Sequence, residues 1–184
     1  MTIDMPLFKE TKKEEKVKAE KRIVRFNASG IEYAVSIERI KEIIYAKEVH
    51  PLPGAREGIE GVISLRGAVV PVIDSRKKLK AAAVPPGPPE HILIVEVRRQ
   101  KIGLIVDRVN EVIAVREDQI QRTESFMDQN AAYVDGIYRV GERLIVLLNL
   151  ERLWTAAETS ELEATLSRTI SNGADLSPQN KRKQ

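Results

Sequence analysis

The stretch GVISLRGAVVPVID, residues 61–74, decides the fold that we expect for this chain. It contains two runs rich in valine and isoleucine, and β-branched residues in runs of this length favour strands. The pair Arg66-Gly67 separates the two runs, and glycine permits the tight backbone of a corner. The stretch therefore predicts a strand, a sharp turn and a second strand, with an arginine at the corner between two apolar runs.

Further runs of the same kind fill residues 22–156, so we expect an all-β domain there. These runs are RIVRF, IEYAVSI, HILIVEV, KIGLIVD, NEVIAV and RLIVLLNL. The stretch AAAVPPGPPE, residues 81–90, separates them as a connector, because proline lacks a backbone donor and fixes its φ angle. Outside the domain we expect a charged segment at residues 1–21, flexible or helical, and a helix with a disordered tail at residues 157–184.

The two sides of the connector resemble each other, which indicates an internal duplication. EYAVSIERIKEII, residues 32–44, aligns with KIGLIVDRVNEVI, residues 101–113. GVISLRGAVVPVID aligns in the same way with GIYRVGERLIVLLN, residues 136–149. Apolar positions coincide almost throughout, and several charged positions coincide as well.

A duplication of this kind predicts two pseudo-symmetric small barrels, SH3- or OB-like, with a shared core, short helices and a C-terminal helix. Each copy supplies about five short strands, which is enough for a small closed barrel. The first half spans about residues 22–80 and the second about residues 91–156.

The composition limits the environment and the partners. The chain has no cysteine, which excludes disulfides and thiolate metal sites and favours a reducing compartment. The net charge is only +3 and aromatic residues make up 4% of the sequence, whereas nucleic-acid binding needs a concentrated basic face and stacking aromatics. No run reaches the roughly 18 apolar residues of a membrane span. We therefore expect a cytoplasmic protein with no nucleic-acid partner and no membrane insertion.

Titratable residues do not form a catalytic or metal-binding pattern in the sequence. The two histidines, His50 and His91, each lie near prolines, and no spacing typical of metal ligands occurs. Phosphate-binding glycine motifs and the GxSxG motif of hydrolases are missing as well. We therefore expect no enzyme and no cofactor, and a small β domain with Val-, Ile- and Leu-rich strands suits protein partners.

The opening stretch, extended to GVISLRGAVVPVIDSRKKL, resembles the characteristic motif of CheW-like coupling domains from bacterial chemotaxis arrays. The blocks EYAVSIERIKEII, IGLIVDRVNEVIAV and YVDGIYRVGERLIVLLNLERL resemble the family's other blocks and follow its order, over residues 22 to about 155. The resemblance implies two pseudo-symmetric five-stranded barrels. It also implies a non-catalytic adaptor that couples methyl-accepting chemoreceptors to a CheA-type histidine kinase, in the cytoplasm on membrane receptor arrays.

The resemblance further implies two interfaces, and contacts between copies of the adaptor in rings. The kinase interface comprises Ile40, Glu42, Ile43 and Glu60. The interface with the cytoplasmic tip of the chemoreceptor comprises Arg66, Ser64 and Gly67. A guanidinium group offers five donors in one plane, which suits Arg66 to an interface. The alternative interpretation is that Arg66 braces its own barrel by binding carbonyl groups of a neighbouring loop.

Two positions depart from the family's pattern. Ser64 stands where asparagine is usual, and Ser75 stands where leucine is usual. A serine hydroxyl donates and accepts like an asparagine amide but with a shorter reach. These departures leave open a second function, that of a CheW-like scaffold in a non-motility chemosensory pathway with a different receptor partner.

Overall fold

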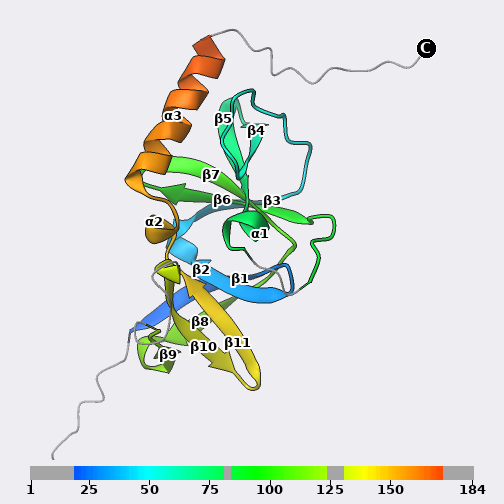
Figure 1. The fold of residues 1–184 in the computed structure, drawn as a ribbon. Coiled ribbons are helices and arrows are strands. Elements are labelled where there is room, and N and C mark those ends of the chain that lie inside the picture. Colours follow the sequence, from blue (N-terminus) through cyan, green and yellow to red (C-terminus); the bar gives the residue numbers. More distant parts are fainter. Residues whose placement is uncertain (1–18, 81–83, 124–130, 172–184) are drawn as a thin grey trace, which may run out of the picture.

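The computed structural model describes residues 19–80, 84–123 and 131–171, which form two sheets with a few helices (Figure 1). The strands are β1 Glu20–Ala28, β2 Ile31–Ser36, β3 Ile40–Tyr45, β4 Ile59–Leu65, β5 Ala68–Asp74, β6 His91–Val97, β7 Gln100–Val106, β8 Arg108–Arg116, β9 Ile120–Gln121, β10 Val134–Val140 and β11 Arg143–Leu148. The helices are η1 Ile37–Arg39, α1 Ser75–Lys78, η2 Glu117–Gln119, α2 Leu150–Leu153 and α3 Ala156–Ser171. The predicted all-β class is confirmed, and α3 is the expected C-terminal helix. The predictions for the first 18 residues and for the tail after α3 concern residues outside the described part.

Each sheet takes strands from both halves of the duplication. The six-stranded sheet has the order β8-β1-β2-β11-β10-β9, and the five-stranded sheet has the order β3-β6-β7-β5-β4. When β1 to β5 are matched in turn with β6, β7, β8, β10 and β11, the two orders coincide, and β9 is an extra strand. One half of the sequence therefore does not build one barrel, which corrects the sequence prediction. The physical reason is that η1 turns the chain after β2, so that β3 joins the opposite sheet.

Each sheet curls until the chain that leaves one edge strand meets the other edge strand. After β3, His50 forms an isolated antiparallel bridge with Val62 of β4, with N···O distances of 2.9 and 2.8 Å. After β8, the short η2 leads into β9, which pairs with β10. The expected closed barrels are thus strongly curled sheets, in which short contacts at the edges replace a continuous ladder among the described residues.

A glycine lies at each of these meeting points. A Cβ atom added to Gly61, whose φ angle is +148°, would lie 2.1 Å from the carbonyl oxygen of His50. A Cβ atom added to the equivalent Gly136 would lie 2.8 Å from the carbonyl oxygen of Gln121. The strand register shifts beside both glycines. Only a residue without a side chain lets the two segments approach this closely.

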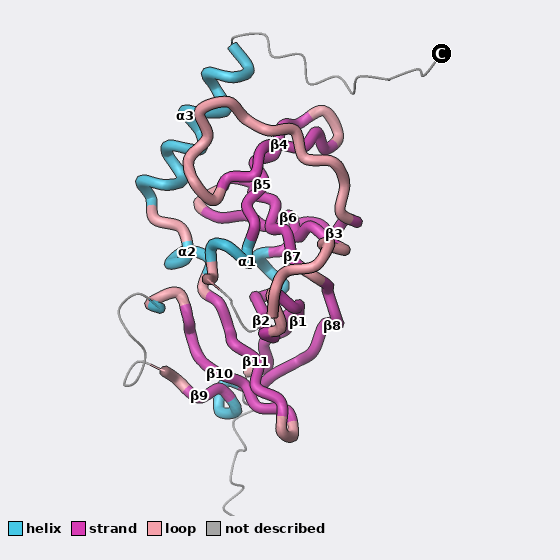
Figure 2. Tube along the Cα trace, turned by 45° about the vertical axis from the view of Figure 1, so that its right-hand side comes forward, coloured by secondary structure: helices cyan, strands magenta, loops and turns pink. Residues whose placement is uncertain are grey.

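The largest apolar core fills the space between the two sheets. It includes Phe26 and Val35 from the six-stranded sheet and Leu93 and Leu104 from the five-stranded sheet. Trp154, which links α2 to α3, is buried in the same core. Smaller apolar clusters fill the concave side of each sheet. Figure 2 shows the result: the sheets lie one above the other, and α3 runs along the side of the five-stranded sheet.

Candidate protein-interaction site on the five-stranded sheet

All residues that the sequence assigns to interfaces lie on the five-stranded sheet. Ile40, Glu42 and Ile43 belong to β3, which forms one edge of that sheet. Glu60 and Ser64 belong to β4 at the other edge, and Arg66-Gly67 forms the corner between β4 and β5. Because the sheet curls, these two edges come close together, although three strands separate them in the hydrogen-bonded order.

Arg66 occupies a corner that holds its side chain outward. The φ angles of Arg66 and Gly67 are +50° and +79°, the left-handed pair that a two-residue hairpin corner requires. The side chain of Arg66 is 79% exposed. Its Nη2 donates a hydrogen bond of 2.9 Å to Oε1 of Glu42 on β3. The structure therefore pairs a residue expected at the kinase interface with a residue expected at the receptor interface.

The side of β3 opposite to this ion pair is partly apolar. Ile43 is 40% exposed and Tyr45 is 82% exposed, and both point from β3 to the same side of the strand. The ring of Tyr45 stacks on His91 with a centroid distance of 5.3 Å. Ile40 is half-buried against the core between the sheets. The sequence analysis missed Tyr45, although the alternation in IKEIIY was the signal that could have found it.

The two serines that depart from the family's pattern have different environments. Ser64 is exposed, and its carbonyl oxygen accepts a hydrogen bond of 2.6 Å from Nζ of Lys47. Ser75 is buried, and its hydroxyl donates a hydrogen bond of 2.5 Å to the carbonyl oxygen of Ile105. Ser75 therefore serves the interior of the fold, and only Ser64 changes the surface beside the Arg66 corner.

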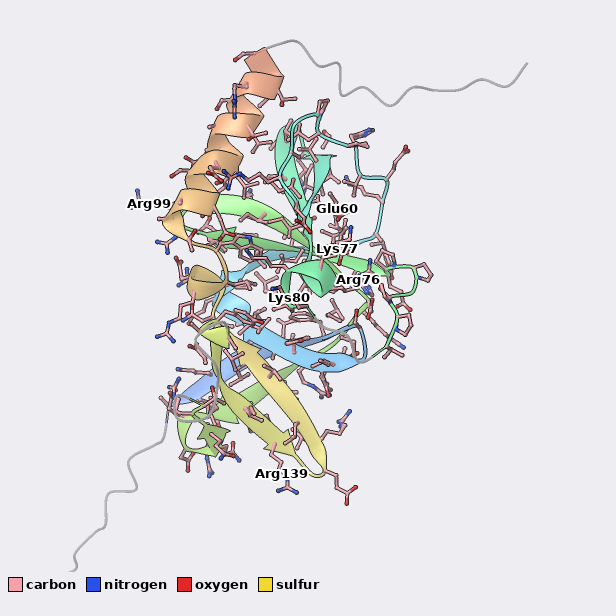
Figure 3. All side chains as sticks on the ribbon, viewed as in Figure 1. Glu60, Arg76, Lys77, Lys80, Arg99 and Arg139 are labelled. Carbon is pink, nitrogen blue, oxygen red and sulfur yellow. The ribbon has the colours of Figure 1, made fainter. Side chains whose placement is uncertain are left out.

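Glu60 belongs to a different part of the surface. Its carboxylate forms an ion pair with Lys77 of α1, as Figure 3 shows, rather than joining Glu42 and Arg66. The hydrogen bond from Lys77 to Glu60 raises the pKa of the lysine. The structure thus brings together Glu42 and Arg66 from the predicted set, leaves Ile43 on the opposite side of β3, and directs Glu60 toward α1.

The histidines take part in the fold rather than in a reactive centre. Nδ1 of His91 accepts a hydrogen bond from the backbone of Val109, and His50 forms the bridge to Val62. In the described residues, no three His, Asp or Glu side chains gather closely enough to hold a metal ion. Among the helices of that same part of the chain, none is long and apolar enough to cross a membrane.

Comparisons with known proteins agree with this geometry. The family model of the CheW-like domain matches residues 22–158. The chemotaxis protein CheW of Bacillus subtilis is 32% identical over 134 residues, which cover 72% of this chain and 86% of that protein. The chemotaxis protein CheW of Treponema pallidum is 29% identical over 147 residues, which cover 77% of this chain and 86% of that protein. The crystal structure of the scaffolding protein TtCheW from Thermoanaerobacter tengcongensis superposes with a TM-score of 0.68 and 32% identity, over 76% of this chain and 96% of that one.

Proposed function

The chain belongs to the CheW-like domain family, and on that premise we propose that it is a non-catalytic chemotaxis adaptor in the cytoplasm. It couples methyl-accepting chemoreceptors to a CheA-type histidine kinase on membrane receptor arrays. The kinase binds the β3 edge around Ile40, Glu42 and Ile43. The cytoplasmic tip of the receptor binds the corner formed by Ser64, Arg66 and Gly67.

The Glu42–Arg66 ion pair is the observation that carries this proposal. It joins an exposed cation to a carboxylate that is 26% exposed, on an edge strand whose opposite side carries the exposed Ile43 and Tyr45. Protein interfaces commonly combine an apolar or aromatic centre with an arginine anchor and a polar rim. An exposed ion pair contributes only about 0–1 kcal/mol to the fold, so a partner can replace one of its members at little cost.

The adaptor acts through position alone. It holds receptor and kinase in a fixed geometry, so that a change in the receptor alters the activity of the kinase. Each contact can be weak, because binding at one site raises the effective concentration of the second partner. Glu60, beside Lys77 on the other edge of the sheet, adds to the kinase interface, and contacts between copies of the adaptor in a ring add to the avidity in the same way.

Ser64 is the observation that favours a second candidate function. It is exposed beside Arg66 and replaces a longer amide side chain at the proposed receptor contact. A CheW-like scaffold with a different receptor, in a chemosensory pathway without motility output, would use the same kinase edge and a different receptor corner. Binding of the kinase without binding of chemotaxis receptors would favour this candidate.

Co-sedimentation with receptor-bearing membranes and the cognate kinase tests the proposal. We expect wild-type protein to join the pellet and to raise kinase activity. Arg66→Glu should weaken receptor binding by about tenfold or more, because it replaces the cation at the proposed receptor contact with a carboxylate that also repels Glu42. Glu42→Arg should weaken kinase binding and leave a folded protein.

The matched control is Arg139→Glu, which makes the same charge change on β10 of the other sheet. Arg139 is exposed, and among the residues that the structure describes its side chain donates only to the carbonyl oxygen of Gly141, two residues away. This variant should pellet like wild type. Equal pelleting of Arg66→Glu and Arg139→Glu would show that Arg66 only braces its own sheet.

A further inference from the structure

The corner between β6 and β7 has an unusual sequence for its backbone. In the described part of the chain, three corners have two consecutive residues with positive φ angles: Ser29-Gly30 at +48° and +82°, Arg66-Gly67 at +50° and +79°, and Arg98-Arg99 at +49° and +66°. Hairpin corners of this type favour glycine or asparagine, because an L side chain is disfavoured in the left-handed region. Arg99 takes the place that glycine has in the other two corners.

The duplication supplies an internal control for this corner. Ile23-Val24 aligns with Ile92-Leu93, and continuing that alignment places Ser29-Gly30 over Arg98-Arg99. The same turn in the same fold is therefore built once with a glycine and once with two arginines. The hairpin itself does not require arginine here, and local departures of this kind concentrate where a surface has another function.

The two arginines differ in their surroundings. Arg98 turns toward α2, where its Nη2 donates a hydrogen bond of 3.1 Å to the carbonyl oxygen of Glu151. The carboxylate of Glu151 also accepts a hydrogen bond of 2.9 Å from Arg39 and lies 3.8 Å from Nε of Arg98. Arg99 is exposed and forms no hydrogen bond or ion pair with any described residue, and Figure 3 shows it projecting from the end of the hairpin near the start of α3.

The chemistry of this corner fits a carboxylate. A guanidinium fork matches the geometry of a carboxylate group, and Glu151 between Arg39 and Arg98 shows that match within the chain. The surrounding surface carries acids as well as bases, since Glu96 pairs with Lys41 nearby on the same sheet. A phosphate backbone needs a continuous basic groove with stacking aromatics, so mixed charges disfavour a nucleic acid.

We propose that Arg99, held outward by the β6–β7 corner, docks an acidic segment of another protein. This contact lies apart from the Glu42–Arg66 pair and goes beyond the coupling function proposed above. Arg98 is a positioning residue, because it ties the corner to α2 and leaves Arg99 free. Arg99 is the anchor that meets the carboxylates of the partner.

Arg99→Gly tests the proposal, with Lys80→Gly as the matched control. Lys80 is also exposed, has a φ angle of +50° and carries one positive charge, but it follows α1, away from the corner. Both variants relieve a left-handed side chain, so each should raise the thermal midpoint by about 2–4 °C. Only Arg99→Gly should weaken binding of a short synthetic peptide with glutamates along one helical face, by about tenfold at low salt. Arg99→Lys should retain part of that binding.

Four results would each overturn the proposal. The first is equal binding of the glutamate peptide by Arg99→Gly and wild type. The second is equal binding of a control peptide in which glutamine replaces every glutamate. The third is a lower thermal midpoint for Arg99→Gly, which would make Arg99 a structural residue. The fourth is tighter binding of a single-stranded oligonucleotide than of the peptide at this corner. Receptor and kinase binding by the Arg66→Glu variant is a separate readout, so the two proposals fail independently.

Discussion

The two sheets use one duplicated glutamate in opposite ways. The alignment of the halves places Glu42 of the five-stranded sheet over Glu111 of the six-stranded sheet. Glu111 pairs with Arg25, whose side chain is only 3% exposed and which also pairs with Glu32. Glu42 instead pairs with Arg66, at an exposed corner. The two glutamates are 57% and 26% exposed, so the contrast lies in their partners: Glu111 reaches a buried arginine, and Glu42 reaches an exposed one.

A single aligned position explains this difference. Arg25 of β1 aligns with Ile94 of β6, which belongs to the apolar cluster inside the five-stranded sheet. The six-stranded sheet thus has a buried cation, Arg25, that binds Glu111, whereas the aligned position of the five-stranded sheet is the apolar Ile94. Among the described residues of its sheet, Glu42 meets no buried cation, and it reaches across the edge to Arg66. Because the arginine that pairs with Glu42 is exposed, a binding partner can replace it at little cost.

The largest effect on stability is expected from Arg25→Met. This change leaves Glu32, which is mostly buried, without its cation, and breaking a buried ion pair costs about 3–5 kcal/mol. Ile94→Met at the aligned position is the control, and it should cost less than about 1.5 kcal/mol because it nearly conserves volume. Urea unfolding followed by circular dichroism measures both. Adding Glu32→Leu to Arg25→Met should restore most of the loss, whereas no restoration would show that packing rather than charge determines the cost.

The second prediction compares Gly61 and Gly136, the two glycines at which the edges of each sheet meet. Gly61→Ala should cost about 3 kcal/mol, because the new methyl group meets a backbone oxygen and the φ angle of +148° disfavours any side chain. Gly136→Ala should cost less, about 2 kcal/mol, because one of its near contacts is the side chain of Ile120, which can move. The same unfolding measurement ranks the two variants. The reverse order would mean that β9, rather than the chain after β3, is the more rigid edge.

Much of this fold follows from the sequence, but the exchange of strands does not. The alignment of the halves correctly pairs Gly61 with Gly136 and predicts the corner at Arg66-Gly67. It is equally compatible with two halves that fold separately and with two halves that exchange the hairpins β1–β2 and β6–β7, because both arrangements can bury the same apolar residues. The parallel pairing of β5 with β7 decides between them, and no local pattern encodes a pairing between distant segments.

The candidate site could be predicted only in part, because it too depends on contacts between distant segments. The corner and the β3 residues are visible as local patterns, but the Glu42–Arg66 contact depends on how far the sheet curls. Arg25 reads as one more charged residue in RIVRF, and its burial becomes visible only through its alignment with Ile94. Glu60 stands one residue before the glycine of the shifted register, and its turn toward Lys77 depends on that shift.

The smallest effect on stability is expected for the Glu42–Arg66 pair itself. A double-mutant cycle with Glu42→Ala and Arg66→Ala should give a coupling energy below about 1 kcal/mol, because the pair is exposed and screened by salt. Thermal and urea unfolding of the four proteins measure this energy. A coupling above about 2 kcal/mol would mean that the pair closes the sheet as a brace, and loss of receptor binding by Arg66→Glu would then reflect a distorted fold. A small coupling energy together with a large loss of receptor binding would show that Arg66 contributes to binding of the partner rather than to stability of the fold. Arg25 is expected to do the reverse, because it is buried inside the six-stranded sheet.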